Sequence, residues 1–178
     1  MTSILKVDQL QDSGGNALIT SDGSGNLTTQ KLLYPAFEAQ LTSSQSLSNA
    51  TDTKVQFDTE IFDTDNCFDN STNYRFTPTV AGKYFVFAEC LLASDAASTF
   101  NNGRVYIFKN GSSLTRSQEN VSNNNIQNST RLSHVITEMN GSSDYLEVYV
   151  RVEATAGSLT VIGGSALRSL FGAYRIGD

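Results

Sequence analysis

The chain has 178 residues, of which 39% are hydrophobic and 17% are charged, and its formal net charge is −6. This length is enough for one well-cored domain with an appendage. A net negative chain without a basic cluster argues against binding to nucleic acid, because contacts with the phosphate backbone need clustered Lys and Arg.

The start of the chain, Met1 to Asp8, lacks the basic segment and the long apolar core of a secretion signal, and no apolar run is long enough for a transmembrane helix. We therefore expect the protein to be made and kept in a cytoplasm until it is assembled or released. The only cysteines, Cys67 and Cys90, are then expected to be free and buried, with a disulfide as the less favoured alternative.

Residues 1–33 differ from the rest, and we predict that they form an N-terminal arm. Residues 4–10 and 17–20 are short strand candidates, each followed by a Gly-rich turn, and residues 27–33 lead into the main domain. Two such strands bury too little surface to fold alone, so they need copies of themselves or another protein as a partner; a disordered tail is the alternative. The apolar anchors available in the arm are Ile4, Leu5, Val7, Leu10, Leu18 and Ile19.

Residues 34–178 predict an all-β sandwich of eight to ten strands. Phe37, Ala39 and Leu41 alternate with polar residues, and Val55 and Phe57 do the same on the next predicted strand. A polar loop over residues 63–73 and a short strand over 74–77 follow. Residues 83–92 are mostly apolar on both faces and rich in β-forming residues, which favours a central strand.

The second half of the main domain continues this pattern. Asn110–Gly111 follows a strand candidate at residues 105–109 and is the strongest hairpin signal in the chain. Residues 119–129 form a polar, Asn-rich loop. The remaining predicted strands are 131–139 and 145–152, which we expect to pair around Asn140–Gly141, and then 159–162 and 170–176.

Several of these segments resemble the C1q/TNF-like jelly-roll family. The run from Tyr74 to Phe87, with Pro78 and Gly82 between two aromatic strands, resembles that family's most characteristic strip. Four further segments resemble other strands of the family in the same order, namely residues 35–41, 105–111, 144–150 and 170–174. The resemblance implies a jelly roll over residues 34–178 that assembles as a compact homotrimer around a three-fold axis.

Two runs, residues 84–87 and 145–149, carry apolar side chains on both strand faces, which is more than one sandwich core uses. A subunit interface would bury the surplus, and a sheet covered by its own loops is the alternative.

The pattern Val7-Asp8-x-Leu10-x-Asp12-x-x-Gly15-Asn16 in the arm resembles N-terminal segments of bacteriophage virion proteins, particularly of marine and cyanobacterial phages. This resemblance implies a non-enzymatic structural virion protein of a tailed bacteriophage. The favoured role is a capsid decoration or cement protein, made in the bacterial host cytoplasm and docked through its arm on the major capsid protein or other virion proteins. The alternatives are a tail or head fibre whose loops bind a host surface glycan, and a bacterial C1q-like ligand-recognition module.

No constellation of residues predicts an enzyme or a cofactor. His134 is the sole histidine, and without a nucleophile elbow it is expected to be a strand residue with a satisfied ring. The cysteines lack zinc-ligand spacing. Asp63, Asp65 and Asp69 are weak calcium candidates, for which a solvated acidic loop is the preferred interpretation.

Polar loops are the candidates for contact with a receptor. They contain short polar side chains that suit hydrogen bonding to sugars, although ordinary loop chemistry is the stronger interpretation. The residues concerned are Asp63, Asn66, Asn70, Asn123, Asn124 and Asn125.

Overall fold

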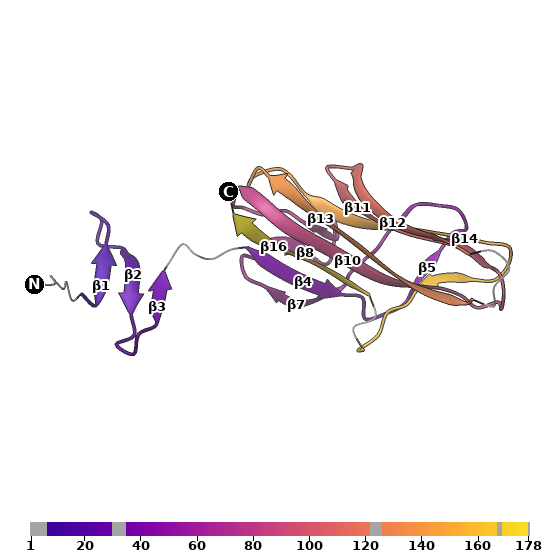
Figure 1. The fold of residues 1–178 in the computed structure, drawn as a ribbon, viewed down its shortest axis with the longest axis horizontal. Helices are drawn as coiled ribbons and strands as arrows, with labels where there is room; N and C mark the ends of the chain where they lie inside the picture. The colour runs from indigo at the N-terminus through magenta and orange to yellow at the C-terminus, as the bar shows by residue number, and fades with distance from the viewer. Residues whose placement is uncertain (1–6, 30–34, 122–125, 167–168, 178) are drawn as a thin grey trace, which may run out of the picture. The chain divides into compact units, whose positions relative to one another are not determined.

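The computed structural model describes residues 7–29, 35–121, 126–166 and 169–177 of the chain. These residues form β-strands joined by turns and loops, and none of them is helical. The all-β prediction is therefore confirmed. The chain divides into two compact units, Met1–Tyr34 and Pro35–Asp178 (Figure 1).

The N-terminal unit is an antiparallel meander of three short strands in the order β1-β2-β3. These strands are β1 (Gln9–Gln11), β2 (Ala17–Ser21) and β3 (Leu27–Thr29). The predicted bounds of the first strand, residues 4–10, are wrong, because the described pairing begins at Gln9; Ile4 and Leu5 lie outside the described residues. The strand β3 was not predicted, because three residues are too few to show an alternating pattern.

The two turns of this meander are built in the same way. Asp12 Oδ1 accepts hydrogen bonds from the backbone N–H groups two and four residues later, at 2.8 and 2.9 Å, and Asn16 Nδ2 donates to Asp12 Oδ2 at 2.9 Å. Asp22 does the same at 2.7 and 3.1 Å, with Asn26 Nδ2 donating at 2.6 Å. The sequence Asp-x-x-Gly-Asn thus satisfies its own turn amides twice.

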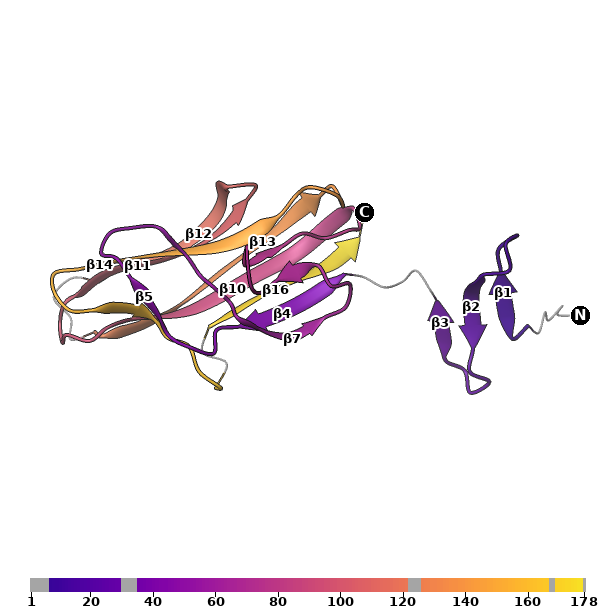
Figure 2. The ribbon, with the colours of Figure 1, turned by 180° about the vertical axis from the view of Figure 1, so that it is seen from behind.

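The larger unit is a sandwich of two antiparallel sheets, seen from opposite sides in Figures 1 and 2. The first, named here the β10 sheet, contains β4 (Ala36–Gln40), β5 (Gln45–Leu47), β7 (Thr59–Asp63), β10 (Gly82–Ser94), β13 (Asn128–Met139), β15 (Leu159–Val161) and β16 (Leu170–Gly177). The second, the β11 sheet, contains β6 (Thr53–Lys54), β8 (Phe68–Asp69), β9 (Arg75–Phe76), β11 (Phe100–Lys109), β12 (Ser112–Asn120) and β14 (Leu146–Ala154).

Strand β10 lies at the centre of its sheet. It pairs with β13 on one edge and with β16 and then β15 on the other. Alternate side chains of this strand enter the core, and Tyr84, Val86, Ala88, Cys90 and Leu92 are all buried. The prediction of a central strand over residues 83–92 is therefore confirmed.

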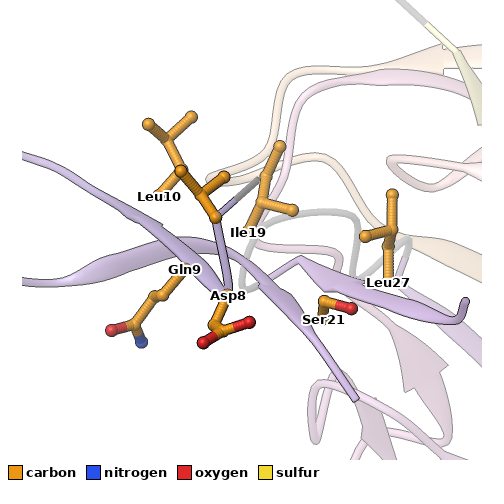
Figure 3. Close-up of a pocket in the computed structure, with 7 residues that line it drawn as sticks. Asp8, Gln9, Leu10, Ile19, Ser21 and Leu27 are labelled. Atoms are coloured by element: carbon orange, nitrogen blue, oxygen red, sulfur yellow. The ribbon is translucent and has the colours of Figure 1, made fainter. Parts of the chain in front are cut away.

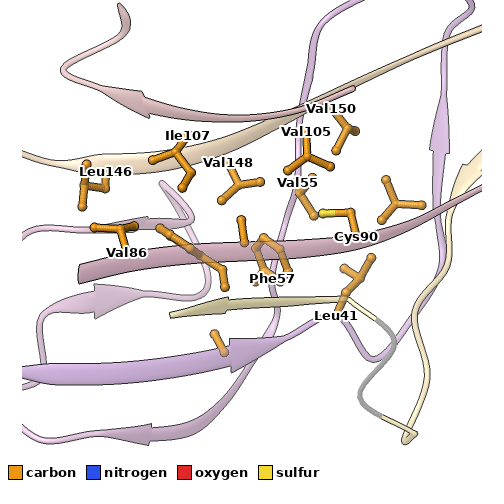
Figure 4. Packing of buried hydrophobic residues seen from close by; sticks show 14 of the residues in the cluster. Leu41, Val55, Phe57, Val86, Cys90, Val105, Ile107, Leu146, Val148 and Val150 are labelled. Atoms are coloured by element: carbon orange, nitrogen blue, oxygen red, sulfur yellow. The ribbon is translucent and has the colours of Figure 1, made fainter. Parts of the chain in front are cut away.

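The core fills the space between the two sheets, and Figure 4 shows side chains of both layers meeting there. At one end Phe37 stacks on Phe68 and Phe76, with ring centroids 4.8 and 4.4 Å apart. Phe171 meets the ring of Phe37 edge-on at 4.9 Å. Because burying one such side chain contributes about 1.5–3 kcal/mol, this cluster is a principal source of stability.

One predicted turn is confirmed, and one predicted strand pairing is wrong. At the hairpin between β11 and β12, Asn110 and Gly111 both have positive φ, 53° and 78°, as a two-residue type I′ turn requires, so this prediction is confirmed. The predicted pairing of residues 131–139 with 145–152 is wrong, because β13 pairs with β10 whereas β14 pairs with β11. Asn140–Gly141 instead lies in a loop that passes from one sheet to the other.

Val55 and Phe57 are buried, as their alternation predicts, but they lie between β6 and β7 rather than within a strand. The residues between two strands can fill a core as well as strand residues can, so burial alone does not identify a strand. In the same way, β8 interrupts the predicted loop over residues 63–73.

Candidate functional site

The outward side of the β10 sheet carries a cluster of aromatic and aliphatic side chains, named here the aromatic face. The strand register places Phe85 between Ile136 of β13 and Tyr174 of β16. It places Phe87 between His134 and Gly172. The aromatic face consists of Phe85, Phe87, Leu132, His134, Ile136 and Tyr174.

The rings of the aromatic face pack on one another. The centroid of Phe85 lies 5.3 Å from that of Tyr174, 6.1 Å from that of His134 and 6.3 Å from that of Phe87. Leu132, Ile136 and Tyr174 nevertheless remain between 46% and 57% exposed. A contiguous exposed apolar surface of this kind is typical of an interaction site.

Gly172 makes room for one ring of the aromatic face. A Cβ added at Gly172 would lie only 2.7 Å from Cε1 of Phe87 and 3.0 Å from the backbone oxygen of Phe37. The absence of a side chain therefore lets the ring of Phe87 lie against the backbone of β16.

The outward side of the β11 sheet has a different character. Lys54 forms an ion pair with Glu147, and Arg151 pairs with Glu153 at 2.8 Å. The ammonium group of Lys54 also lies 5.9 Å from the centre of the Tyr149 ring. Because these charged groups are already paired within the chain, covering this side with a partner would gain less than covering the aromatic face.

Apolar side chains on both faces are found in β10, where Tyr84 and Val86 are buried and Phe85 and Phe87 point outward. In β14 the outward apolar residue is Tyr149, whose ring stacks on Phe108 at 4.3 Å. The surplus apolar surface is thus concentrated on the β10 sheet.

His134 lies in a strand, as predicted, but its side chain is exposed and its ring packs beside Phe85. It is part of the aromatic face, and the predicted satisfaction of its ring nitrogens stays a prediction. Cys67 and Cys90 are free and buried, as predicted. Burial raises the pKa of both thiols.

Two of the calcium candidates, Asp63 and Asp69, accept hydrogen bonds from their own loop. Asp63 Oδ2 accepts a hydrogen bond from the N–H of Phe68 at 2.7 Å, and Asp69 Oδ1 accepts one from the N–H of Thr72 at 2.8 Å. The Thr72 bond is the main reason that the pKa of Asp69 lies well below its usual range. No group of three or more His, Cys, Asp or Glu side chains within the described ranges is arranged to hold a metal ion, so Asp63, Asp65 and Asp69 are not brought together as a calcium site.

The predicted receptor loops are only partly described. Asn66 is exposed and has a left-handed backbone, with φ of 54°, and Asn70 is half-buried. Asn123, Asn124 and Asn125 lie outside the described residues. A receptor contact through these residues stays a prediction.

The structure reveals a polar cleft of about 290 Å³ that no sequence pattern indicates. Although partial burial raises the pKa of its carboxylate Asp58, hydrogen bonds from the backbone and hydroxyl of Thr42, at 2.9 and 2.8 Å, hold that pKa below its ordinary value. Tyr74 has a φ of 51°, which is strained for an aromatic residue. The cleft is lined by Leu41, Ser43, Ser44, Gln45, Gln56, Asp58 and Tyr74.

One side of the N-terminal meander carries an apolar pocket of about 220 Å³. Figure 3 shows Leu10, Ile19 and Leu27 projecting from the same side of the ribbon. Their exposed fractions run from 37% to 68%. Of the predicted anchors, Val7, Leu10 and Ile19 line this pocket, whereas Leu18 does not; Leu27 joins them from the strand that the sequence did not predict.

Among the residues that the structure describes, no helix is long and apolar enough to cross a membrane.

Comparison with known proteins identifies the fold of the larger unit. No protein-family model matches the chain, and no curated protein matches it. Among solved structures, Eiger TNF from S. frugiperda is 12% identical over 82% of this chain and 94% of its own, with a TM-score of 0.56. The globular domain of zebrafish complement 1qA protein is 15% identical over 80% and 97%, with a TM-score of 0.54. Murine APRIL is 14% identical over 80% and 99%, with a TM-score of 0.55. The larger unit therefore has the C1q/TNF-like jelly-roll fold that the sequence predicts.

Proposed function

We propose that this chain is a non-enzymatic structural protein that forms a homotrimer through the aromatic face and is attached to a larger particle by its N-terminal arm. In its specific form, the proposal is a capsid decoration protein of a tailed bacteriophage. The arm then docks on the major capsid protein or another virion protein.

The exposed aromatic face is the observation that carries self-association. Covering half-exposed side chains such as Leu132, Ile136 and Tyr174 would contribute on the order of 1 kcal/mol each. Copies that meet in a closed ring around a three-fold axis would bury these faces without leaving an open end that grows into fibres. The family resemblance in the sequence supports three copies.

The resemblance of the arm to phage virion segments supports the virion role. The arm also exposes apolar side chains that the described part of its own unit leaves uncovered, as an attachment segment would. A decoration protein stabilises a shell by burying such surface between shell subunits.

Sedimentation of the full chain at micromolar concentration tests self-association. We expect a trimer for the native protein and a monomer for Ile136→Asp, because a carboxylate within the buried face would be desolvated. Leu114→Asp is the matched control, since Leu114 is 40% exposed on β12 of the other sheet. A native protein that sediments as a 19.3 kDa monomer would contradict the proposal.

Cryo-electron microscopy of intact particles tests the attachment. Density of this chain over the icosahedral shell, with residues 1–33 between capsid subunits, is the expected result. Density confined to the tail or one vertex would replace decoration by a fibre role. Absence of the chain from every particle would contradict the virion role.

The cleft beside Tyr74 favours a second candidate function, a ligand-recognition module. An aromatic ring next to amide and carboxylate groups suits the apolar and hydroxyl faces of a sugar. Under this alternative the native chain would bind members of a glycan array and Tyr74→Ala would lose that binding. If the native chain and Tyr74→Ala gave the same binding or none, the cleft would have no such role.

A further inference from the structure

We propose that the apolar side of the arm is covered by the arms of two other copies of this chain, so that Leu10, Ile19 and Leu27 of three chains pack together. This inference rests on the proposed trimer of the larger unit. It names the partner of a surface that the described part of its own unit leaves exposed.

The strand register of the meander places three of its apolar side chains on the same side of the sheet. Leu10 lies opposite Ile19, and Leu27 lies opposite Ser21, two residues beyond Ile19 on the same side of β2. Figure 3 shows Leu10, Ile19 and Leu27 on one side and Gln9 on the other. One side of the sheet is therefore an apolar layer without a second layer over it.

The arm is too small to stay folded with that side in water. None of the side chains described between residues 7 and 27 is buried. A sheet needs an opposing layer to form a core, and strands of three to five residues are marginal without one. A partner that supplies this layer is thus a condition for the meander to persist.

Chain connectivity makes copies of the same chain the favoured partner. Residues 30–35 join β3 to β4, and the seven residue steps from Thr29 to Ala36 span at most about 25 Å when fully extended. The first residue of β4, Ala36, pairs with Tyr174 of the aromatic face. In the proposed trimer Ala36 of each chain therefore lies next to the shared interface, and a short tether from there gives the arms effective concentrations on the order of millimolar.

Charge does not oppose contact between identical arms. Residues 7–29 contain three aspartates and neither Lys nor Arg. However, Asp12 and Asp22 lie in the turns and bind their own backbone, and Asp8 points away from the Leu10 side in Figure 3. Asp8 is among the residues that line the pocket, so the surface that would pack is mainly apolar with one carboxylate at its border.

The assignment divides the predicted docking residues into two sets. Leu10 and Ile19 serve contact among the copies, together with Leu27. Leu18, which is 46% exposed and alternates to the other side of β2, stays available to a carrier particle.

Cysteine cross-linking in the full chain tests this packing. Leu27→Cys places a thiol on the apolar side, and Thr20→Cys places one on the opposite side of the neighbouring strand. The native thiols at Cys67 and Cys90 are buried and serve as the background. With a short bis-maleimide, we expect covalent dimers of Leu27→Cys at ten times or more the yield of Thr20→Cys, with sedimentation of both variants run in parallel.

Hydrogen exchange of the amides in β2 gives an independent readout. Leu27→Ser should accelerate this exchange about tenfold or more, because it removes a side chain from the layer between copies, whereas Leu18→Ser should leave it within about twofold. A trimer whose two cysteine variants cross-link equally, or whose exchange is unchanged in Leu27→Ser, would overturn the inference and leave the proposed trimer standing. A monomer would overturn both.

Discussion

At the scale of single residues, Gly111 and Gly141 share a left-handed backbone, with φ of 78° and 69°, but differ in what surrounds them. A Cβ at Gly111 would find its nearest neighbour, the hydroxyl of Tyr145, at 3.6 Å. A Cβ at Gly141 would lie 2.7 Å from the carbonyl carbon of Val80 and would collide with the backbone of Ala81. The first glycine is required by conformation alone, and the second by conformation and space.

Replacing these two glycines by alanine separates the two requirements. Gly111→Ala should lower the free energy of unfolding by about 1–2 kcal/mol, which is the usual penalty for a side chain at positive φ. Gly141→Ala should lower it by about 3 kcal/mol or more, since the backbone it meets cannot rotate away. Urea denaturation at one protein concentration measures both, and equal losses would show that Gly141 is not crowded.

At the scale of the elements, the turns of the arm respond to pH. The side-chain and backbone hydrogen bonds from Asn16 hold the pKa of Asp12 below its ordinary value, and those from Asn26 and Ser24 do the same for Asp22. A lowered pKa in the folded state means that the stabilisation is complete above the ordinary pKa of about 3.9 and is lost as the pH falls further.

We therefore expect the turn amides of the arm to lose protection on acidification below about pH 4. Nuclear magnetic resonance of the amide of Gly14 in the full chain is the measurement, with the amide of Ser24 as its counterpart in the second turn. Asp12→Asn should remove the pH dependence at the first turn and keep it at the second. If Asp12→Asn changed the pH dependence of both turns alike, the two aspartates would not stabilise their turns independently.

The elements also show how far sequence patterns reach. Residues 83–92 and the Asn110–Gly111 hairpin were predictable because apolar runs and positive-φ residues are local signals. The partners of β13 and β14 were not, because an alternating strand shows which residues face the core but not which sheet it joins. A loop such as Asn140–Gly141 connects strands of one sheet or of two with the same turn chemistry.

For the candidate surfaces too, some features could be predicted from the sequence and others could not. The surplus of apolar residues at Phe85 and Phe87 was visible in the sequence, since both neighbours along the strand are also apolar. The contribution of Gly172 depends on a register that only the folded sheet supplies. The cleft beside Tyr74 joins residues distant in sequence and left no local pattern to find.

At the scale of the whole molecule, the two buried thiols become accessible to solvent through different opening motions of the structure. Cys90 is fully buried at the centre of β10, whereas Cys67 retains 7% exposure and its Sγ donates to the backbone oxygen of Asp65 at 3.5 Å. Exposing Cys90 requires separating the two sheets, and exposing Cys67 requires only the opening of its loop.

A thiol reagent should therefore modify Cys67 much faster than Cys90, by on the order of tenfold or more. The variants Cys67→Ala and Cys90→Ala isolate the two rates, followed by mass spectrometry over time. In a self-associating protein the Cys90 rate should also fall as protein concentration rises, because association stabilises the folded state. Equal rates for the two thiols would contradict this order of opening.

The meander of the arm has a consequence for how its length can change. Its two turns share the sequence pattern Asp-x-x-Gly-Asn and the same hydrogen bonds to the aspartate, so a ten-residue segment made of a turn and a strand acts as a unit. Each added unit reverses the direction of the chain. With three strands the chain enters and leaves the meander at opposite ends, and it can serve as a spacer; with two or four it would return to the end where it began. The parity of the strands, more than their length, thus decides whether such an arm holds two objects apart or brings them together.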